Sequence, residues 1–143
     1  MAHEDKGHYA AKHKDQKINK TITQKIQALS NDNCISCVLA HKGAKELNIP
    51  PSEIGVQIDL LEYRISECQL GLFGYTGGQK KIDPDIKIAP DLNEYLDKAS
   101  KDGRISCLES WDTAKKLNTK RLDMGSACEK KNIKINPCQL GAF

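Results

Sequence analysis

The sequence predicts a mainly helical protein with short strands, made of two copies of one small unit. The phrase CQLGLF at residues 68–73 returns as CQLGAF at residues 138–143. With a shift of 70 residues and no gap, residues 35–73 and 105–143 are identical at 14 of 39 positions. Before each CQLG phrase, apolar residues recur at the spacing of amphipathic helices. CQLG therefore marks the end of a repeating unit.

The repeat divides the chain into four parts. We expect a flexible polar tail at residues 1–17, repeat one at 18–73, a linker at 74–87 and repeat two at 88–143. The linker, GYTGGQKKIDPDIK, combines paired glycines, lysines and a proline, which is typical of a connection between domains. Because a unit of this size buries little apolar surface, we expect the two repeats to depend on each other.

The first helix of repeat one is predicted from Ile22, Ile26 and Leu29, which fall on one helical face. Thr21 and Gln24 have the spacing of a capping box at its start. The short stretch ISC comes next, and it is too short and too β-branched to continue the helix. We therefore expect a short strand between the first and second helices.

The second and third helices are predicted at residues 37–47 and 51–62, and again at 107–117 and 120–131. Asn48 and Asn118 can take the left-handed conformation that ends a helix. Ser106 and Glu109 have the spacing of a capping box for the second helix of repeat two. The stretches YRIS and NIKIN then alternate apolar and polar residues, as half-buried strands do.

The composition is that of a soluble globular protein, with 38% hydrophobic residues, 29% charged residues and a formal net charge of +3. No apolar run is long enough for a membrane helix, and residues 1–17 lack the apolar core of a signal peptide. We therefore expect a cytoplasmic protein without a membrane partner. In that compartment the six cysteines are expected to be thiols, metal ligands or redox groups rather than structural disulfides.

Two stretches, AKELNIPPSEIGVQI and AKKLNTKRLDMGSAC, resemble the helix-turn-helix of the winged helix-turn-helix domains of transcription regulators. Each has an alanine, a leucine, a turn residue and then an aliphatic residue in the second helix of the motif. Both have asparagine where the family usually has glycine, and any β-wing has to be very short. The resemblance implies two winged-helix-like three-helix units, with residues 51–62 and 120–131 as the elements that face DNA.

Charge separates these two candidate recognition elements. The first contains Glu53, Asp59 and Glu62 and no lysine or arginine, which makes it a poor surface for phosphates. The second is basic, so we expect DNA contacts mainly from repeat two. The alternative is an ordinary solvated basic face. The residues predicted to contact phosphate are Lys115, Lys116, Lys120, Arg121 and Lys134.

Each repeat also contains a pair of cysteines, Cys37 with Cys68 and Cys107 with Cys138. The first member is predicted at a helix N-terminus, where the helix dipole favours a thiolate. The second member follows the strand that we expect beside ISC, so the two sulfurs of a repeat should be neighbours. Three interpretations stay open: a redox pair, part of a metal site, or small residues in a packed corner.

Repeat one has two further candidate metal ligands. Cys34 and His41, together with Cys37 and Cys68, would supply four ligands for zinc or part of a ligand set for an iron–sulfur cluster. In repeat two, arginine and tryptophan stand at the positions equivalent to Cys34 and His41. Any such metal site therefore belongs to repeat one alone.

The remaining motifs do not favour an enzyme. His3, His8 and His13 are spaced by five in the tail, which fits one helical face poorly. The sequence has no recognisable carboxylate pair, catalytic triad, phosphate loop or dinucleotide fingerprint. We predict no catalytic residues, and two hypotheses remain. The first is a DNA-binding regulator that acts through repeat two; the second is a non-DNA adaptor or accessory subunit of a redox or metalloenzyme assembly.

Overall fold

The computed structural model describes residues 9–143, which form a mainly helical protein with two short parallel sheets. The chain divides into two compact units, and neither is a continuous stretch of sequence. Unit 1 contains the chain up to Cys68, together with Phe73–Gln79 and Gln139–Phe143. Unit 2 contains Gln69–Leu72 and Lys80–Cys138. No helix in the described part of the chain has both the length and the apolar character that a membrane crossing needs.

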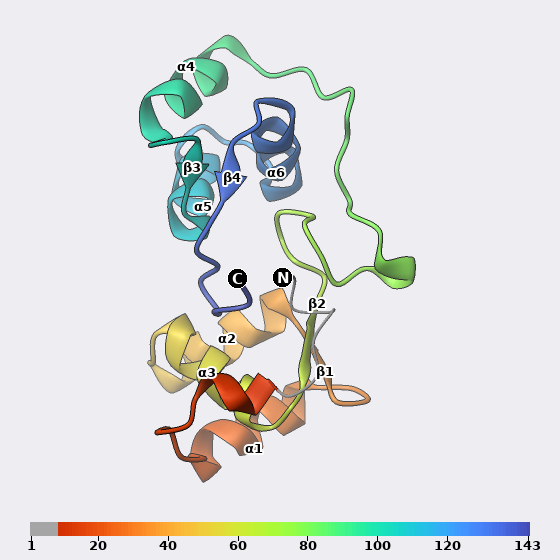
Figure 1. Ribbon diagram of the computed structural model, residues 1–143, viewed down its shortest axis with the longest axis vertical. Helices are drawn as coiled ribbons and strands as arrows, with labels where there is room; N and C mark the ends of the chain where they lie inside the picture. Colours follow the sequence, from red (N-terminus) through yellow and green to blue (C-terminus); the bar gives the residue numbers. More distant parts are fainter. Residues whose placement is uncertain (1–8) are drawn as a thin grey trace. The chain divides into compact units, whose positions relative to one another are not determined.

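Unit 1 has three α-helices and a two-stranded sheet (Figure 1). Its strands pair in parallel, with Cys34 opposite Arg64 and Ile35 opposite Ile65. Two 3₁₀ helices, η2 (Tyr9–Lys12) and η3 (Thr76–Gly78), also belong to this unit. The main elements are α1 (Lys20–Leu29), β1 (Cys34–Ser36), α2 (Cys37–Leu47), α3 (Pro51–Leu60) and β2 (Arg64–Ser66).

Unit 2 has the same order of elements. Its helices and strands begin at residues 90, 104, 107, 121 and 134, each 70 residues after its counterpart at 20, 34, 37, 51 and 64. Its two strands are also parallel, with Arg104 opposite Lys134. The elements are α4 (Pro90–Ala99), β3 (Arg104–Ile105), α5 (Cys107–Lys116), α6 (Arg121–Lys130) and β4 (Lys134–Ile135).

The prediction that the ISC strand lies beside the last strand of each repeat is confirmed. The predicted β-wing is not found in residues 9–143, because the strands pair in parallel and form no hairpin. A wing needs a strand that returns antiparallel after a tight turn. Here each second strand runs instead into a turn of the CQLG phrase.

The turns follow the local sequence. Asn48 and Asn118 have φ angles of 56° and 52°, which confirms their predicted left-handed conformation. The hydroxyl of Ser106 accepts a hydrogen bond from the backbone N–H of Glu109 at 3.0 Å, which confirms the predicted cap of α5. The predicted capping box of the first helix is wrong, because α1 begins earlier and Asn19 caps it by accepting from the N–H of Ile22 at 3.2 Å.

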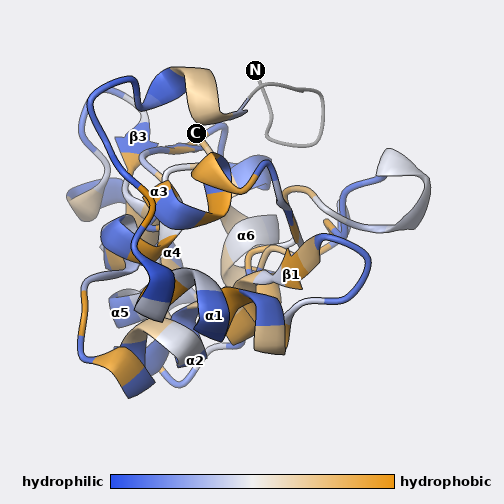
Figure 2. Cartoon of the chain, turned by 90° about the horizontal axis from the view of Figure 1, so that it is seen from below, coloured by the Kyte–Doolittle hydropathy of each residue, from blue (hydrophilic) through white to orange (hydrophobic). Residues whose placement is uncertain are grey.

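Each unit has its own apolar core. In unit 1, the buried core residues include Ile22 and Ile26 of α1 and Ile35 and Ile65 of the sheet. Figure 2 shows the pattern behind this packing: β1 is hydrophobic, whereas α1 carries both hydrophilic and hydrophobic residues. Buried core residues of unit 2 include Leu92, Leu96, Ile105, Met124 and Cys128.

The N-terminal segment covers the third helix of unit 1. The carboxylate of Asp59, which is 2% exposed, accepts from Lys12 Nζ at 3.0 Å and from His13 Nε2 at 2.8 Å. The side chain of Gln57 is hydrogen-bonded to the backbone of Lys17 and Asn19 at 3.0 and 2.9 Å. Residues 9–17, predicted as part of a flexible tail, thus contact α3 closely. His3 and His8 of the same prediction lie outside the described residues.

The segment before α4 covers the third helix of unit 2 in a similar way. The backbone N–H of Asp83 donates to Ser126 Oγ at 2.9 Å, and Lys130 Nζ donates to the carbonyl of Ile86 at 2.8 Å. The five consecutive residues Met124–Cys128 are all buried, although α6 was predicted to present a face to DNA. Residues 80–86, predicted as linker, therefore form part of the packed structure of unit 2.

The two QLG segments complete these units at a pair of glycines. In unit 1, Gly55 of α3 lies so close to the backbone of Leu140 that a Cβ atom at residue 55 would overlap the Leu140 carbonyl. In unit 2, Gly125 of α6 has the same relation to the Leu70 carbonyl. Both leucines are buried. In Figure 1, the dark blue end of the chain lies beside α3, and the loop after β2 lies beside α6.

The glycine contacts predict a large difference between helical glycines. Gly55→Ala should destabilise the protein by about 3 kcal/mol, since a backbone carbonyl has to move to make room. Gly43→Ala in α2 is the matched control, because its Cβ would meet only flexible side-chain ends, Ile54 Cδ1 at 3.1 Å and Leu29 Cδ1 at 3.2 Å. We expect this control to stay within about 1 kcal/mol of the native protein. Equal urea midpoints for the two variants would contradict the close contact at Gly55.

Candidate functional site

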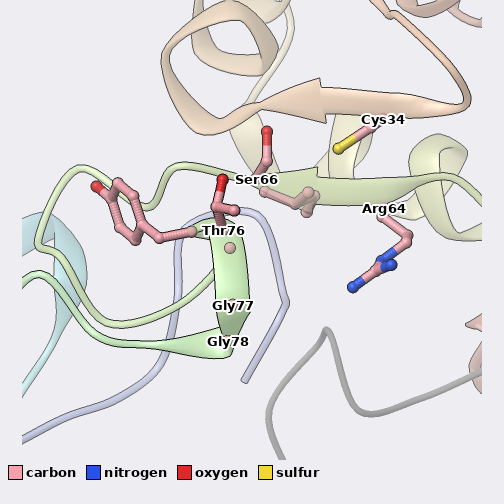
Figure 3. Close-up of a pocket in the computed structure, with 9 residues that line it drawn as sticks. Cys34, Arg64, Ser66, Thr76, Gly77 and Gly78 are labelled. Carbon is pink, nitrogen blue, oxygen red and sulfur yellow. The ribbon is translucent and has the colours of Figure 1, made fainter.

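A pocket of about 340 Å³ lies in unit 1, on the outer face of the β1–β2 sheet. Ile35 and Ile65 point from this sheet into the core, so their neighbours in each strand point to the opposite face. Figure 3 shows the strand residues on one side of the pocket and the η3 turn on the other. The pocket is lined by Cys34, Arg64, Ile65, Ser66, Gly74, Tyr75, Thr76, Gly77 and Gly78.

The polar side chains that line this pocket can all donate hydrogen bonds. Arg64 supplies a guanidinium group, Ser66 and Thr76 supply hydroxyls, and Cys34 supplies a partly exposed thiol. Among residues 9–143, the pocket lining contains no aspartate or glutamate. Two glycines of the turn, Gly77 and Gly78, have φ angles of 81° and 70°, which are readily available to glycine.

Tyr75 connects the pocket to the cysteines of unit 1. Its hydroxyl donates to the carbonyl oxygen of Cys68 at 2.5 Å. Burial raises the pKa of Tyr75 to about 12, with further contributions from the charges of Cys68, Glu67 and Cys37. The phenol therefore stays neutral at physiological pH, and both Cys37 and Cys68 lie close enough to influence it.

Cys37 and Cys107 begin α2 and α5, as predicted, and each is 6% exposed. In unit 2, the backbone N–H of Cys107 donates to the carbonyl of Pro137 at 3.0 Å, directly before Cys138. The sequence neighbourhoods of the two cysteines thus meet, as expected from the strand order. All six cysteines are present as thiols. That the sulfurs of one repeat can bond or share a ligand stays a prediction.

The predicted metal ligands lie in different surroundings. Among residues 9–143, no group of three or more histidine, cysteine, aspartate or glutamate side chains is arranged to hold a metal ion. Cys34 lies in β1 and lines the outer pocket, whereas Cys37 is buried at the start of α2. The zinc or iron–sulfur interpretation of Cys34, Cys37, His41 and Cys68 stays a prediction.

The five basic residues predicted to contact DNA are all exposed. Two of them lie over aromatic rings: Arg121 Cζ is 3.7 Å from the ring centre of Trp111, and Lys116 Nζ is 5.4 Å from that of Tyr95. Cation–π contacts of this kind hold long side chains in place on the surface. Lys115 and Lys116 end α5, Lys120 and Arg121 begin α6, and Lys134 lies in β4.

Sequence reasoning missed the pocket, because its lining comes from residues predicted as strand and residues predicted as linker. The strand periodicity indicated that Arg64 and Ser66 lie on the face opposite Ile65. The stretch GYTGG indicated a turn. Nothing local indicated that this turn returns to the sheet of unit 1.

No known protein family, curated protein or solved structure matches this chain. The candidate sites therefore depend on their own geometry.

Exposure predicts how the six thiols differ in reactivity. In the native protein, Cys34 and Cys138 should be alkylated first, because they are partly exposed and the other four are buried. Cys128 should react last, since it is 1% exposed and burial raises the pKa of its thiol to about 12. Peptide mapping after timed iodoacetamide treatment measures the order, and urea-unfolded protein provides the control. Alkylation of Cys128 as fast as Cys34 in native protein would contradict the packing of α6.

Proposed function

We propose that this chain is a non-enzymatic binding protein, an adaptor or accessory subunit, whose units recognise short, turn-forming protein segments. The observation that carries the proposal is the close contact between a helical glycine and a Q-L-G segment in each unit. At both glycines the absence of a side chain lets the backbone of another segment approach the helix. Each unit thus already contains a surface shaped for a piece of protein chain.

The burial of the third helices supports this proposal over DNA recognition. A recognition helix has to place an exposed face in the major groove. In α3, the buried residues include Gln57 and Asp59, and chain segments occupy their polar groups. In α6, the residues from Met124 to Cys128 are buried in succession. Contacts with protein segments therefore take the place that DNA contacts would need.

The repeated elements extend the proposal to the whole chain. Positive φ angles recur 70 residues apart, at Asp32 and Asp102, at Glu62 and Asn132, and at Gly71 and Gly141. These matches support two copies of one unit, related to the helix-turn-helix class in their second and third helices. On this view the second copy preserves the same segment-binding surface as the first. The CQLG phrase is then the segment that this surface recognises.

The proposal is tested by supplying the segment as a peptide. We expect a labelled peptide with the sequence of residues 136–143, NPCQLGAF, to bind the full-length variant Leu140→Ala/Phe143→Ala. In this variant the chain's own C-terminal segment should be held less tightly in unit 1. Leu140→Ala removes a buried side chain, and Phe143→Ala removes the edge-to-face contact with Phe73, whose ring centre lies 5.8 Å from that of Phe143. Fluorescence anisotropy measures binding, with a scrambled peptide as control.

Adding Gly55→Ala to the same variant should abolish peptide binding, since the alanine methyl group would occupy the position of the Leu140 carbonyl. Circular dichroism verifies that the triple variant is still folded at the temperature used. Equal binding of the native and scrambled peptides would contradict the proposal. So would peptide binding that the glycine substitution leaves unchanged.

DNA binding remains the second candidate function, favoured by one observation. The exposed basic residues Lys115, Lys116, Lys120 and Arg121 lie around the turn between α5 and α6. If they contact phosphates, Lys120→Ala/Arg121→Ala should weaken DNA binding and flatten its salt dependence by about one counterion per lost contact. DNA titrations at several salt concentrations measure this slope. Absence of DNA binding at low salt would exclude this second function.

A further inference from the structure

The pocket of unit 1 carries an inference that is independent of the adaptor proposal. Among its described lining residues, the one formal charge is the guanidinium group of Arg64, which is always protonated in proteins. Within residues 9–143, no hydrogen bond or ion pair engages this group. An arginine without a carboxylate partner beside a concave surface is suited to bind an anion from solution.

The other polar groups fit the same kind of ligand. Ser66 and Thr76 each offer a hydroxyl donor to the pocket. A Cβ built on Gly77 or Gly78 would have no heavy atom within 4 Å, so the backbone of the turn is open to a ligand. Figure 3 shows Arg64 facing this turn across the pocket. Donors therefore lie on two sides of the space, and the described part of the lining contributes no carboxylate.

The size of the pocket indicates more than a bare ion. About 340 Å³ is near the lower end of pockets that hold small organic ligands. The ring of Tyr75 provides apolar surface beside the polar groups. A compact organic group attached to the anion could contact this surface.

We propose that this pocket binds the phosphate group of a small phosphate ester. The guanidinium of Arg64 pairs with two phosphate oxygens, since its planar fork matches their geometry. The hydroxyls of Ser66 and Thr76 donate to the remaining oxygens. The organic part of the ester lies toward Tyr75, and no covalent step takes place.

Unit 2 provides a matched comparison. At the position 70 residues after Arg64 stands Lys134, which is also exposed and lies on a parallel strand. The positions equivalent to Cys34 and Ser66 are Arg104 and Asn136. Unit 2 thus carries a similar positive charge without the serine hydroxyl. Lys134→Gln therefore removes one positive charge outside the pocket, and Arg64→Gln removes one inside it.

The test is a titration of the full chain with phenyl phosphate, followed by ¹H–¹⁵N NMR, with phenol as the uncharged control. We expect saturable shifts of the amide signals of Ser66 and of residues 76–78, and no comparable response to phenol. Arg64→Gln should weaken binding about tenfold, equivalent to about 1.4 kcal/mol, whereas Lys134→Gln should leave it unchanged. Arg64→Lys should give an intermediate affinity, because it keeps the charge and loses the planar fork.

Three results would overturn the proposal. The first is the absence of saturable shifts at millimolar phenyl phosphate. The second is unchanged binding in Arg64→Gln. The third is an equal loss in Arg64→Gln and Lys134→Gln, which would indicate a nonspecific response to net charge. Because Arg64 is exposed, its substitution should preserve the fold, and the unperturbed amide signals of the same spectra verify this.

Discussion

The contact between a helical glycine and a leucine carbonyl is the constraint on which the two units depend. Gly55 meets Leu140 in unit 1, and Gly125 meets Leu70 in unit 2. Each leucine comes from the repeat that does not contain its glycine. The phrase CQLG is therefore a segment that leaves its own repeat and completes the other one. This gives a physical reason for the same phrase at two places in one short chain.

This contact also determines which surfaces of α3 and α6 are covered by other segments of the chain. A helix covered on one side by a Q-L-G segment and on another by the preceding chain keeps only part of its surface exposed. Asp59 illustrates the consequence, because its carboxylate is directed to Lys12 and His13 rather than to solvent. One of the three acidic residues that made this helix a poor DNA surface in the sequence is thus paired within unit 1.

Most of the elements could be predicted from the sequence, because each depends on neighbouring residues. The helices beginning at Cys37 and Cys107 follow from their serine caps and periodicity, and the left-handed Asn48 and Asn118 follow from local conformational preference. The partner of each QLG segment could not be predicted in this way. Both repeats contain the sequence CQLG and a glycine at the equivalent position. The sequence therefore fits equally well whether each QLG segment contacts the glycine of its own repeat or that of the other repeat, and only tertiary packing distinguishes the two.

The candidate sites were less predictable for the same reason. The exposure of Lys120 and Arg121 follows from their polar positions at a helix start, but the burial of Ser126 depends on the segment at Asp83. The pocket joins the outer face of β2 to a glycine turn that composition alone assigns to a linker. The sequence therefore predicted Arg64 as a strand residue and did not predict it as part of the pocket.

The most direct test of the account is the pattern of nuclear Overhauser effects at the two glycines. In dilute native protein, the Hα protons of Gly55 should show cross-peaks to the Hα proton of Leu140, and those of Gly125 to the Hα proton of Leu70. Cross-peaks from Gly55 to Leu70 and from Gly125 to Leu140 would contradict it, because each repeat would then be completed by its own closing phrase.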